Sequence, residues 1–381
     1  MSALLNWLAT LPSLLQIPVV IVAFLVVVGL LVFFIEIAPR PGRGYTIMRL
    51  VVCVLVPVAL VLVFGLEASA FWVAIVAALL GALLFWFDFR SRNGTAYLIQ
   101  LFAFMAPAIL LLLVGLFYPS IKTIVSSFFS NDGTQFVGFA NYIWVFSPGQ
   151  QGLYAFINTL VWTLVAPAIA TGIGLAYAAF VDRSVGERVL KVFVFMPVAI
   201  SLVGASIIWK FFYDYRQGSQ IGLLNEIVTL FGGQPVNWLQ SYPLNMFMLI
   251  VILIWSQTGF AMVILSASIK SVPNDQIEAA MLDGTNGWQR FWNVTVPGIR
   301  PTIVVVWITI SIAALKVYDI IATTTAGQND STVLGYEMVR QFSILPPQTG
   351  HSAALAVLIL VLVTPFIIYN AHNLKRQREE I

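Results

Sequence analysis

The chain has few charged residues, one cysteine and two histidines. Asp, Glu, Lys and Arg make up 9% of its 381 residues, whereas soluble domains average roughly a quarter. This scarcity excludes a water-soluble globular protein. The single cysteine, Cys53, excludes an intrachain disulfide and argues against a thiolate metal site. The two histidines, His351 and His372, belong to no metal-ligand cluster, and a net charge of +3 is too small to indicate a nucleic-acid partner.

The sequence also lacks the motifs of an ATP-hydrolysing enzyme. No Gly-x4-Gly-Lys-Ser/Thr phosphate loop occurs, and no group of side chains forms a catalytic constellation. We therefore expect a chain that is not an enzyme and that has no cofactor of its own.

Long apolar runs are abundant instead, since 60% of the residues are hydrophobic. A helix needs about 20 mostly apolar residues to cross a bilayer. Because the runs are continuously apolar rather than alternating, a barrel is excluded and the sequence predicts an all-α polytopic membrane protein with about nine transmembrane helices. The nine predicted spans are Ile17–Ile37, Ile47–Leu66, Ala70–Phe87, Tyr97–Tyr118, Leu153–Val181, Val189–Phe212, Pro243–Ile269, Pro301–Ala322 and His351–Tyr369.

The distribution of Lys and Arg predicts how these spans are oriented. With the C-terminus placed in the cytoplasm, 14 of the 19 Lys and Arg fall in inside segments, four fall outside, and Lys316 lies within a span. The positive-inside rule therefore predicts an N-terminus outside and a C-terminus in the cytoplasm.

Two patterns within the spans predict how the helices pack. Ala170, Gly174 and Ala178 recur every four residues, and such small-residue faces let helices approach closely. Pro197 and Pro365 are expected to kink their spans, because proline removes a backbone donor and its ring clashes with the preceding turn.

The predicted cytoplasmic loop 271–300 is unusual because it has the pattern of two short helices joined by a glycine. Asn274 is placed to cap the first helix, and Gly284 can take the left-handed conformation that ends it. Asn286 is placed to cap the second helix, which Pro297 is expected to terminate. Each helix has an apolar face at helical spacing, formed by Ile277, Ala280 and Met281 and by Trp288, Phe291 and Trp292. These apolar faces are equally compatible with two roles of the loop: contact with lipid headgroups, or insertion in a groove of a partner protein.

The motif in this loop resembles the EAA loop of binding-protein-dependent ABC importer permeases. The residues that carry the resemblance are Glu278–Ala279–Ala280, Asp283–Gly284, Phe291, Val294, Val296–Pro297 and Pro301, with valine at two positions where the family usually has Ile and Leu. The resemblance implies that the loop is seated in a cleft of a cytoplasmic ATPase. It also implies the partners of such an importer: a second homologous permease, a dimer of ABC ATPases that bind ATP and Mg, and an extracytoplasmic sugar-binding protein.

The resemblance extends over residues 97–381. Phe195–Met196–Pro197 and the segments 204–210, 315–319 and 325–327 are similar to the maltose and alpha-glucoside branch of sugar permeases. The similarity implies a six-span "F-type" core at 97–381 in a bacterial cytoplasmic membrane and an oligosaccharide as solute. Residues 1–96 are left as three additional spans to which the sequence assigns no role.

Lys316 and Asp319 are the most informative residues within the predicted spans. A charge inside a span costs at least ~2.5–3.5 kcal/mol, so Lys316 should face the protein interior or an aqueous cavity. Asp319 follows three residues later, within reach on the same helix face. Two interpretations remain open: the pair lies along the solute path together with Tyr318, or it is an internal ion pair that holds helices together.

Other polar and aromatic residues of the spans have the same two interpretations. Trp255, Gln257 and Asn158 could contact a sugar, although hydrogen bonds between helices are the simpler role for each. An ion-coupled secondary transporter is the alternative function, and it would need carboxylates at corresponding positions in two halves of the membrane domain. Asp319 is the one strong candidate for such a carboxylate.

Overall fold

The computed structural model describes residues 105, 109, 112–182, 184–216 and 222–379. Residues Pro119–Ile381 form one compact unit, which we describe by itself. The first three predicted spans and most of the fourth lie outside the described residues. Within the described residues the chain is helical, without a β-strand and with one isolated bridge between Phe129 and Phe136.

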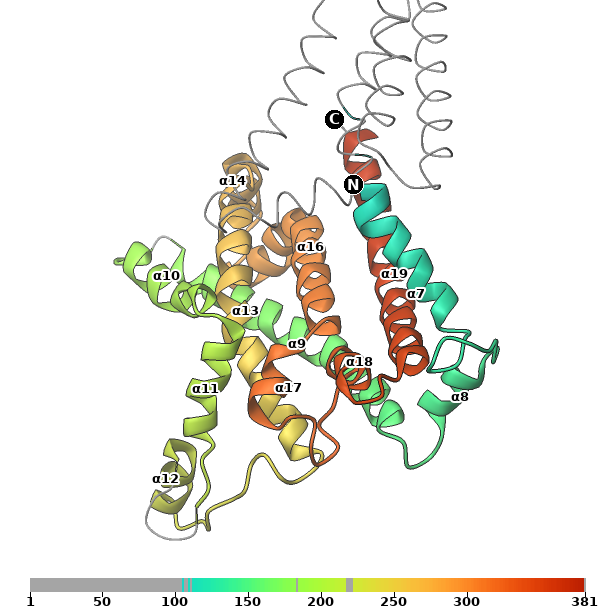
Figure 1. Cartoon of the computed structure of the whole chain (residues 1–381). Coiled ribbons are helices and arrows are strands. Elements are labelled where there is room, and N and C mark those ends of the chain that lie inside the picture. The colour runs from blue at the N-terminus through green and yellow to red at the C-terminus, as the bar shows by residue number, and fades with distance from the viewer. Residues whose placement is uncertain (1–104, 106–108, 110–111, 183, 217–221, 380–381) are drawn as a thin grey trace, which may run out of the picture. The chain divides into compact units, whose positions relative to one another are not determined.

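Four long helices form the body of this unit (Figure 1). They are α9 (Gln151–Val181), α13 (Leu244–Lys270), α16 (Val296–Leu315) and α19 (Thr349–Glu379). The shorter helices of the unit are α7 (Tyr118–Ser126, from Pro119 on), α8 (Ala140–Phe146), α10 (Glu187–Phe195), η4 (Met196–Ala199), α11 (Leu202–Phe212), α12 (Leu223–Leu230), α14 (Asn274–Leu282), α15 (Gly287–Arg290), η5 (Phe291–Thr295), α17 (Asp319–Thr324) and α18 (Leu334–Ser343). The described residues before the unit include η3 (Leu113–Phe117).

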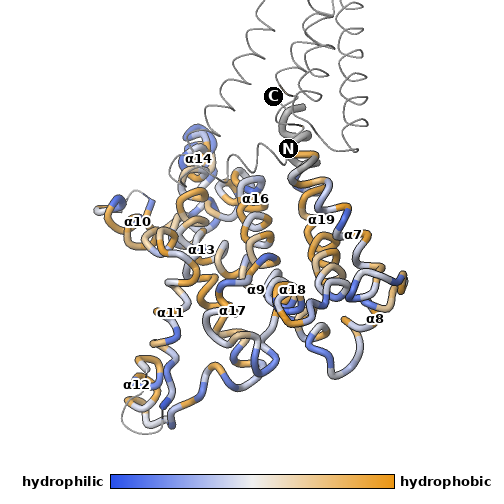
Figure 2. Tube along the Cα trace, in the orientation of Figure 1, coloured by the Kyte–Doolittle hydropathy of each residue, from blue (hydrophilic) through white to orange (hydrophobic). Residues whose placement is uncertain are grey.

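Four helical segments of the described chain are long and apolar enough to cross a membrane. Three of them, Gln151–Val181, Leu244–Lys270 and Thr349–Asn370, confirm the predicted fifth, seventh and ninth spans within a few residues. The fourth, Gly287–Leu315, corresponds to the predicted eighth span with shifted bounds. Apolar residues run along these helices, and hydrophilic residues gather at α14 and around α12 (Figure 2).

The sixth predicted span is not one straight helix. It consists of α10 with η4, followed by α11, and the two parts are bent by 101°. Pro197 lies in η4, where it has no N–H to continue the α-helical ladder. Ile200 and Ser201 then take extended backbone angles, and the Ser201 hydroxyl caps α11 by accepting from Gly204 N at 3.1 Å. The kink that Pro197 predicts is therefore present, as a complete break of the helix.

The predicted bounds of the eighth span, Pro301–Ala322, are wrong at both ends. At the start, the helix begins well before Pro301, because α15 continues through η5 into α16, and Pro297 lies where the wider π-helical turn of η5 gives way to α16. At the other end α16 stops at Leu315, and Lys316 follows as its C-cap. A cation at the C-terminal end of a helix interacts favourably with the helix dipole, and here the Lys316 side chain is exposed.

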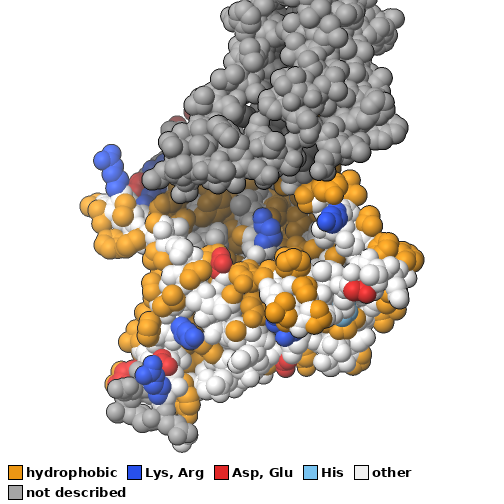
Figure 3. Space-filling model, in the orientation of Figure 1, with side chains coloured by type: hydrophobic (Ala, Val, Ile, Leu, Met, Phe, Trp, Pro, Cys, Tyr) orange, Lys and Arg blue, Asp and Glu red, His pale blue; other side chains and the backbone are white. Residues whose placement is uncertain are grey.

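The centre of the unit is the packing of α13 against α9 and α16. Ala170, Gly174 and Ala178 are buried on α9, and a Cβ added to Gly174 would lie 2.6 Å from the Ala261 Cβ on α13. The predicted small-residue face is therefore the contact that brings the two helices together. The outward faces carry exposed apolar side chains, for example Phe193 on α10, and these side chains gather over α10 and α19 in Figure 3.

Candidate functional site

The loop between α13 and α16 has the predicted helix–glycine–helix form. The first helix, α14, ends in a left-handed turn at Gly284, whose φ is 79°. Gly284 N donates to Met281 O at 3.0 Å and Thr285 N donates to Ala280 O at 3.2 Å, which is the Schellman pattern of a helix C-terminus. Asn286 caps α15 through a capping box with Gln289, whose N donates to Asn286 Oδ1 at 2.8 Å.

Two details of the predicted loop are wrong. Asn274 is the first residue of α14 rather than its cap, since the N-cap is Pro273 and no side chain caps this end. Pro297 does not terminate the second helix, because α15, η5 and α16 form one continuous helical segment that leads into the span. The second half of the loop is therefore a direct extension of a membrane helix.

The seven predicted coupling residues divide into an outward and an inward group. The exposed residues are Glu278, Ala279, Asp283, Gly284 and Pro297. Ala280 is buried, and its carbonyl oxygen accepts from both the Thr285 N and the Thr285 Oγ1. Phe291 is half-buried and lies edge-on to Trp292, with ring centroids 5.4 Å apart. The inward residues hold the shape of the loop, and the outward ones are available to a partner.

Large apolar side chains extend the outward surface of the loop. Leu282 is 90% exposed and Trp288 is 69% exposed. Ile277, by contrast, packs against the core together with Val272 and Ile299, so it fastens α14 to the ends of the spans. Sequence reasoning missed Leu282, although it lies four residues after Glu278 and hence on the same side of the helix. We call Leu282, Trp288, Glu278 and Asp283 the coupling surface.

The predicted solute-path residues Lys316, Tyr318 and Asp319 lie where α16 gives way to α17. Lys316 is the C-cap of α16 and Asp319 is the first residue of α17, so the two are not on one helix face. Within the described residues, they form no ion pair with each other. The ring of Tyr318 stacks on that of Tyr336, at 5.8 Å and 24°.

Trp255 and Gln257 lie in the middle of α13 and are half-buried. The Trp255 ring packs edge-on against Trp209 of α11, with ring centroids 5.9 Å apart. Trp255 packs against the core cluster to which Val317, just after the end of α16, also belongs. Among the described residues the Gln257 side chain has no hydrogen-bond partner, so its amide is available.

Asn158 is buried and holds the loop that precedes α18. Its Nδ2 donates to Asp330 O at 2.6 Å and to Thr332 O at 2.8 Å. Asn245 of α13 makes a matching bond, with Nδ2 2.8 Å from Asn329 O. Both amide hydrogens of Asn158 are therefore occupied within the chain, and sequence reasoning missed the second anchor at Asn245.

Asn158→Asp is expected to destabilise the protein. The carboxylate has no hydrogens to donate, and it would place a buried charge against the carbonyls of Asp330 and Thr332; each unpaired buried group costs about 1–3 kcal/mol. Thermal unfolding in detergent should show a lower Tm. Asn237→Asp is the matched control, because the Asn237 side chain has no hydrogen-bond partner among the described residues. Equal stability of the two variants would contradict this role of Asn158.

A polar cavity of about 220 Å³ lies at the far end of α17 from Lys316. Its lining includes Lys210, Asp214, Asn237, Gln240 and Thr324, in which charged, amide and hydroxyl groups are combined. Asp319 begins α17 and Thr324 ends it, so this one short helix connects the cavity to the predicted solute path.

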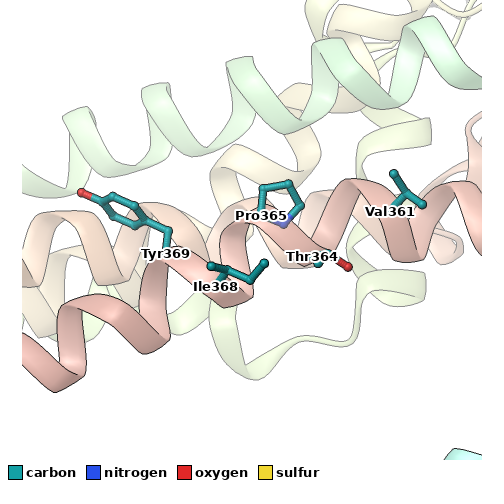
Figure 4. A pocket seen from close by; sticks show the side chains of 5 residues that line it. All are labelled: Val361, Thr364, Pro365, Ile368 and Tyr369. Atoms are coloured by element: carbon teal, nitrogen blue, oxygen red, sulfur yellow. The ribbon is translucent and has the colours of Figure 1, made fainter.

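A second, apolar cavity of about 630 Å³ runs along α19 (Figure 4). It is lined by Val361, Thr364, Pro365, Ile368 and Tyr369. The Thr364 hydroxyl already donates to Leu360 O at 2.7 Å. This lining suits hydrocarbon, and it offers few partners for sugar hydroxyls.

Known proteins resemble the chain in sequence. The alpha-glucoside transport system permease protein AglF of Rhizobium meliloti is 46% identical over 290 residues, covering 75% of this chain and 86% of the relative. The osmoprotective compounds uptake permease protein GgtC of Synechocystis sp. is 42% identical over 278 residues, covering 72% and 99%.

Solved structures resemble it in fold. A crystal structure of a bacterial ABC transporter involved in the import of the acidic polysaccharide alginate superposes with a TM-score of 0.63 at 20% identity, covering 75% of this chain and 99% of that one. Residues 168–379, more than half of the sequence, match one family of transport proteins. The chain therefore belongs to the family of binding-protein-dependent transport system inner membrane components.

Proposed function

We propose that this chain is the permease subunit of an ATP-driven importer for a sugar, an oligosaccharide of the alpha-glucoside type. The observation that carries the proposal is the coupling surface, since a loop between two spans needs no exposed leucine and tryptophan unless another molecule covers them. The relative at 46% identity is named for alpha-glucoside transport, which supports the choice of solute.

The proposed assembly contains a second homologous permease, a dimer of cytoplasmic ATPases and an extracytoplasmic sugar-binding protein. The ATPases bind ATP and Mg, and this chain supplies neither ligands nor catalysis for them. A related alginate transporter has been solved in complex with a periplasmic protein that carries an alginate pentasaccharide, which supports a partner of this kind. We place the N-terminus outside and the C-terminus in the cytoplasm, with a transport core at 97–381 and three further spans in 1–96.

The proposed mechanism is alternating access driven through the coupling loop. Because α15, η5 and α16 are one helical segment, a displacement of the loop would move the span that ends at Leu315, next to Lys316. The bend between α10 and α11 gives the sixth span a hinge at which its two halves can change their angle. Movement at both places would open the path first to one side of the membrane and then to the other.

The proposed solute contacts are Lys316, Tyr318, Asp319, Trp255 and Gln257. An ammonium and a carboxylate that do not neutralise each other can bond to sugar hydroxyls, and the Tyr318 ring offers an apolar face to a sugar. Asn158 is the exception in the predicted set, because its amide hydrogens are already used. The polar cavity beyond α17 would form the outer part of the same path.

Replacing Lys316 tests the proposal. In proteoliposomes that hold the whole complex, Lys316→Met is expected to lower the apparent sugar affinity about 10–100-fold, because a charged hydrogen bond contributes about 1.5–3 kcal/mol. Basal ATP hydrolysis should not change. Lys122→Met is the matched control, since Lys122 is an exposed lysine of α7.

The energy source is tested with the same proteoliposomes. Uptake should require internal ATP and the binding protein, and a protonophore should leave it unaffected. Uptake that follows the proton gradient without ATP would overturn the proposed function and favour the ion-coupled alternative.

A further inference from the structure

Four charged side chains join three helices at the end of α13 that leads into the coupling loop. Asp182 is the C-cap of α9, and Glu187 and Lys191 lie on α10. Lys270, the last residue of α13, places its Nζ 2.5 Å from Glu187 Oε1 and 3.4 Å from Asp182 Oδ1. Lys191 Nζ lies 2.5 Å from the same Glu187 oxygen and also donates to Ser266 Oγ of α13. The cluster therefore ties α10 to α13 twice.

The burial of the carboxylates separates this cluster from an ordinary surface ion pair. The Asp182 side chain is 11% exposed and that of Glu187 is 22% exposed, whereas Lys270 is 48% exposed. Isolated exposed pairs contribute little. Here the two ammonium groups compensate carboxylates that are largely removed from water, so reversing one charge leaves a poorly solvated carboxylate next to another.

The opposite end of α10 is fixed to α13 by a different contact. A Cβ on Gly259 of α13 would lie 2.5 Å from Val194 O and 2.8 Å from Phe195 Cα, so the two backbones cross directly. Val194 also packs against the core cluster that contains Leu265. With nine residues, α10 is about 13 Å long, and both of its ends are held on α13.

Helix α10, held on α13 at both ends, lies between the coupling loop and the bend of the sixth span. Only three residues separate Lys270 from α14, and one of them, Val272, is buried in the core that Ile277 of α14 contacts. On the other side, α10 leads through η4 into the 101° bend and α11. Because α10 is fixed to α13 at two points, a displacement of the loop reaches the bend without being absorbed along α10.

We propose that Lys270 and Glu187 are positioning residues that make α10 and α13 one rigid unit, so that movement of the coupling loop is delivered to the bend of the sixth span. The inference rests on the proposed function for the source of the movement. It depends on no particular solute. It predicts that breaking the pair disconnects the bend from the ATPase while the complex stays assembled.

The first test measures movement at the bend directly. Cys53 is replaced by serine, so that Ile200→Cys between η4 and α11 carries the one thiol of the chain. Labelling of Ile200→Cys by a maleimide is compared in the complete complex with and without ATP and vanadate. We expect the rate to change about fivefold or more with Lys270 intact, and to be insensitive to nucleotide in Lys270→Glu and in Glu187→Lys.

Lys122→Glu is the control, because Lys122 is an exposed lysine of α7 with no ion pair among the described residues and lies outside the proposed solute path. It should keep the nucleotide response. If Lys270→Glu also keeps it while ATP hydrolysis continues, the inference fails. If the response follows the inference but no sugar is transported, the proposed solute fails and the inference stands. No response with Lys270 intact would overturn the inference.

A second test restores the link covalently. In the chain without Cys53, Glu187→Cys and Lys270→Cys are combined, and a short bis-methanethiosulfonate is added to the assembled complex; each thiol displaces a sulfinate and forms a reducible disulfide to the linker. We expect the unlinked pair to lose ATP-driven uptake and the linked pair to regain it, with reduction reversing the gain. Inhibition by the link would mean that α10 must slide on α13 during transport, which contradicts the proposal.

Discussion

Leu282→Arg is expected to release the ATPase from the purified permease and to abolish ATP-driven uptake. Leu282 is 90% exposed on α14, so it contributes almost nothing to the folding of this chain. On the proposed function Leu282 lies in the contact with the ATPase, and removing a hot-spot side chain from such a contact costs about 2 kcal/mol or more, about 30-fold in affinity. Arginine adds to this the desolvation of a charge in an apolar contact.

The measurement is copurification of the ATPase through a tag on the permease, followed by uptake in proteoliposomes. Leu345→Arg is the matched control, because Leu345 is 93% exposed in the connection between α18 and α19, far along the chain from the coupling loop. It should retain the ATPase. Retention of the ATPase and of uptake by Leu282→Arg would rule out the coupling surface as the docking site and return the loop to the lipid-headgroup role.

The local structure of the coupling loop was predictable because it depends on neighbouring residues. Gly284 and Asn286 take the predicted conformations since a left-handed turn and a capping box are encoded within a few positions. The sequence did not predict which side of each helix in the coupling loop faces outward. Ala280 and Phe291 belong to the motif yet turn inward, because α14 packs against α15 and η5 within the loop.

The apolar runs predicted that the spans exist, but they did not predict where the spans bend or end. Hydropathy is continuous across Pro197 and Ser201, so it predicts a single span where the chain bends by 101°. It also carries the eighth span past Lys316, because Val317, Ile320 and Ile321 are apolar, although they belong to the core around α17. The contacts of Lys270 were likewise invisible, since they join residues more than 80 positions apart.

Gly174→Val is expected to prevent the close packing of α9 on α13. Even a Cβ at Gly174 would lie 2.6 Å from Ala261 Cβ and 2.9 Å from Met262 N. Both are atoms on or next to a helix backbone, which cannot rotate away as a long side chain would. Overpacking of this kind costs typically 1–3 kcal/mol, and valine adds two methyl groups to the clash. We expect a low yield of assembled protein in the membrane and a Tm lower by about 2–4 °C for each kcal/mol lost.

Gly172→Val separates this packing effect from helix propensity. Gly172 lies on the same helix two residues earlier, and a Cβ there meets no atom within 4 Å. Both substitutions replace glycine with the same β-branched residue in a helix interior, so their intrinsic helix preferences cancel in the comparison. The difference in Tm therefore reports how closely α9 approaches α13. Helix α13 also ends at Lys270 and leads into the coupling loop. We therefore expect any Gly174→Val protein that folds to have a displaced loop and reduced uptake. Equal Tm values and equal uptake for the two variants would mean that the helices are farther apart than the contact at Ala261 indicates.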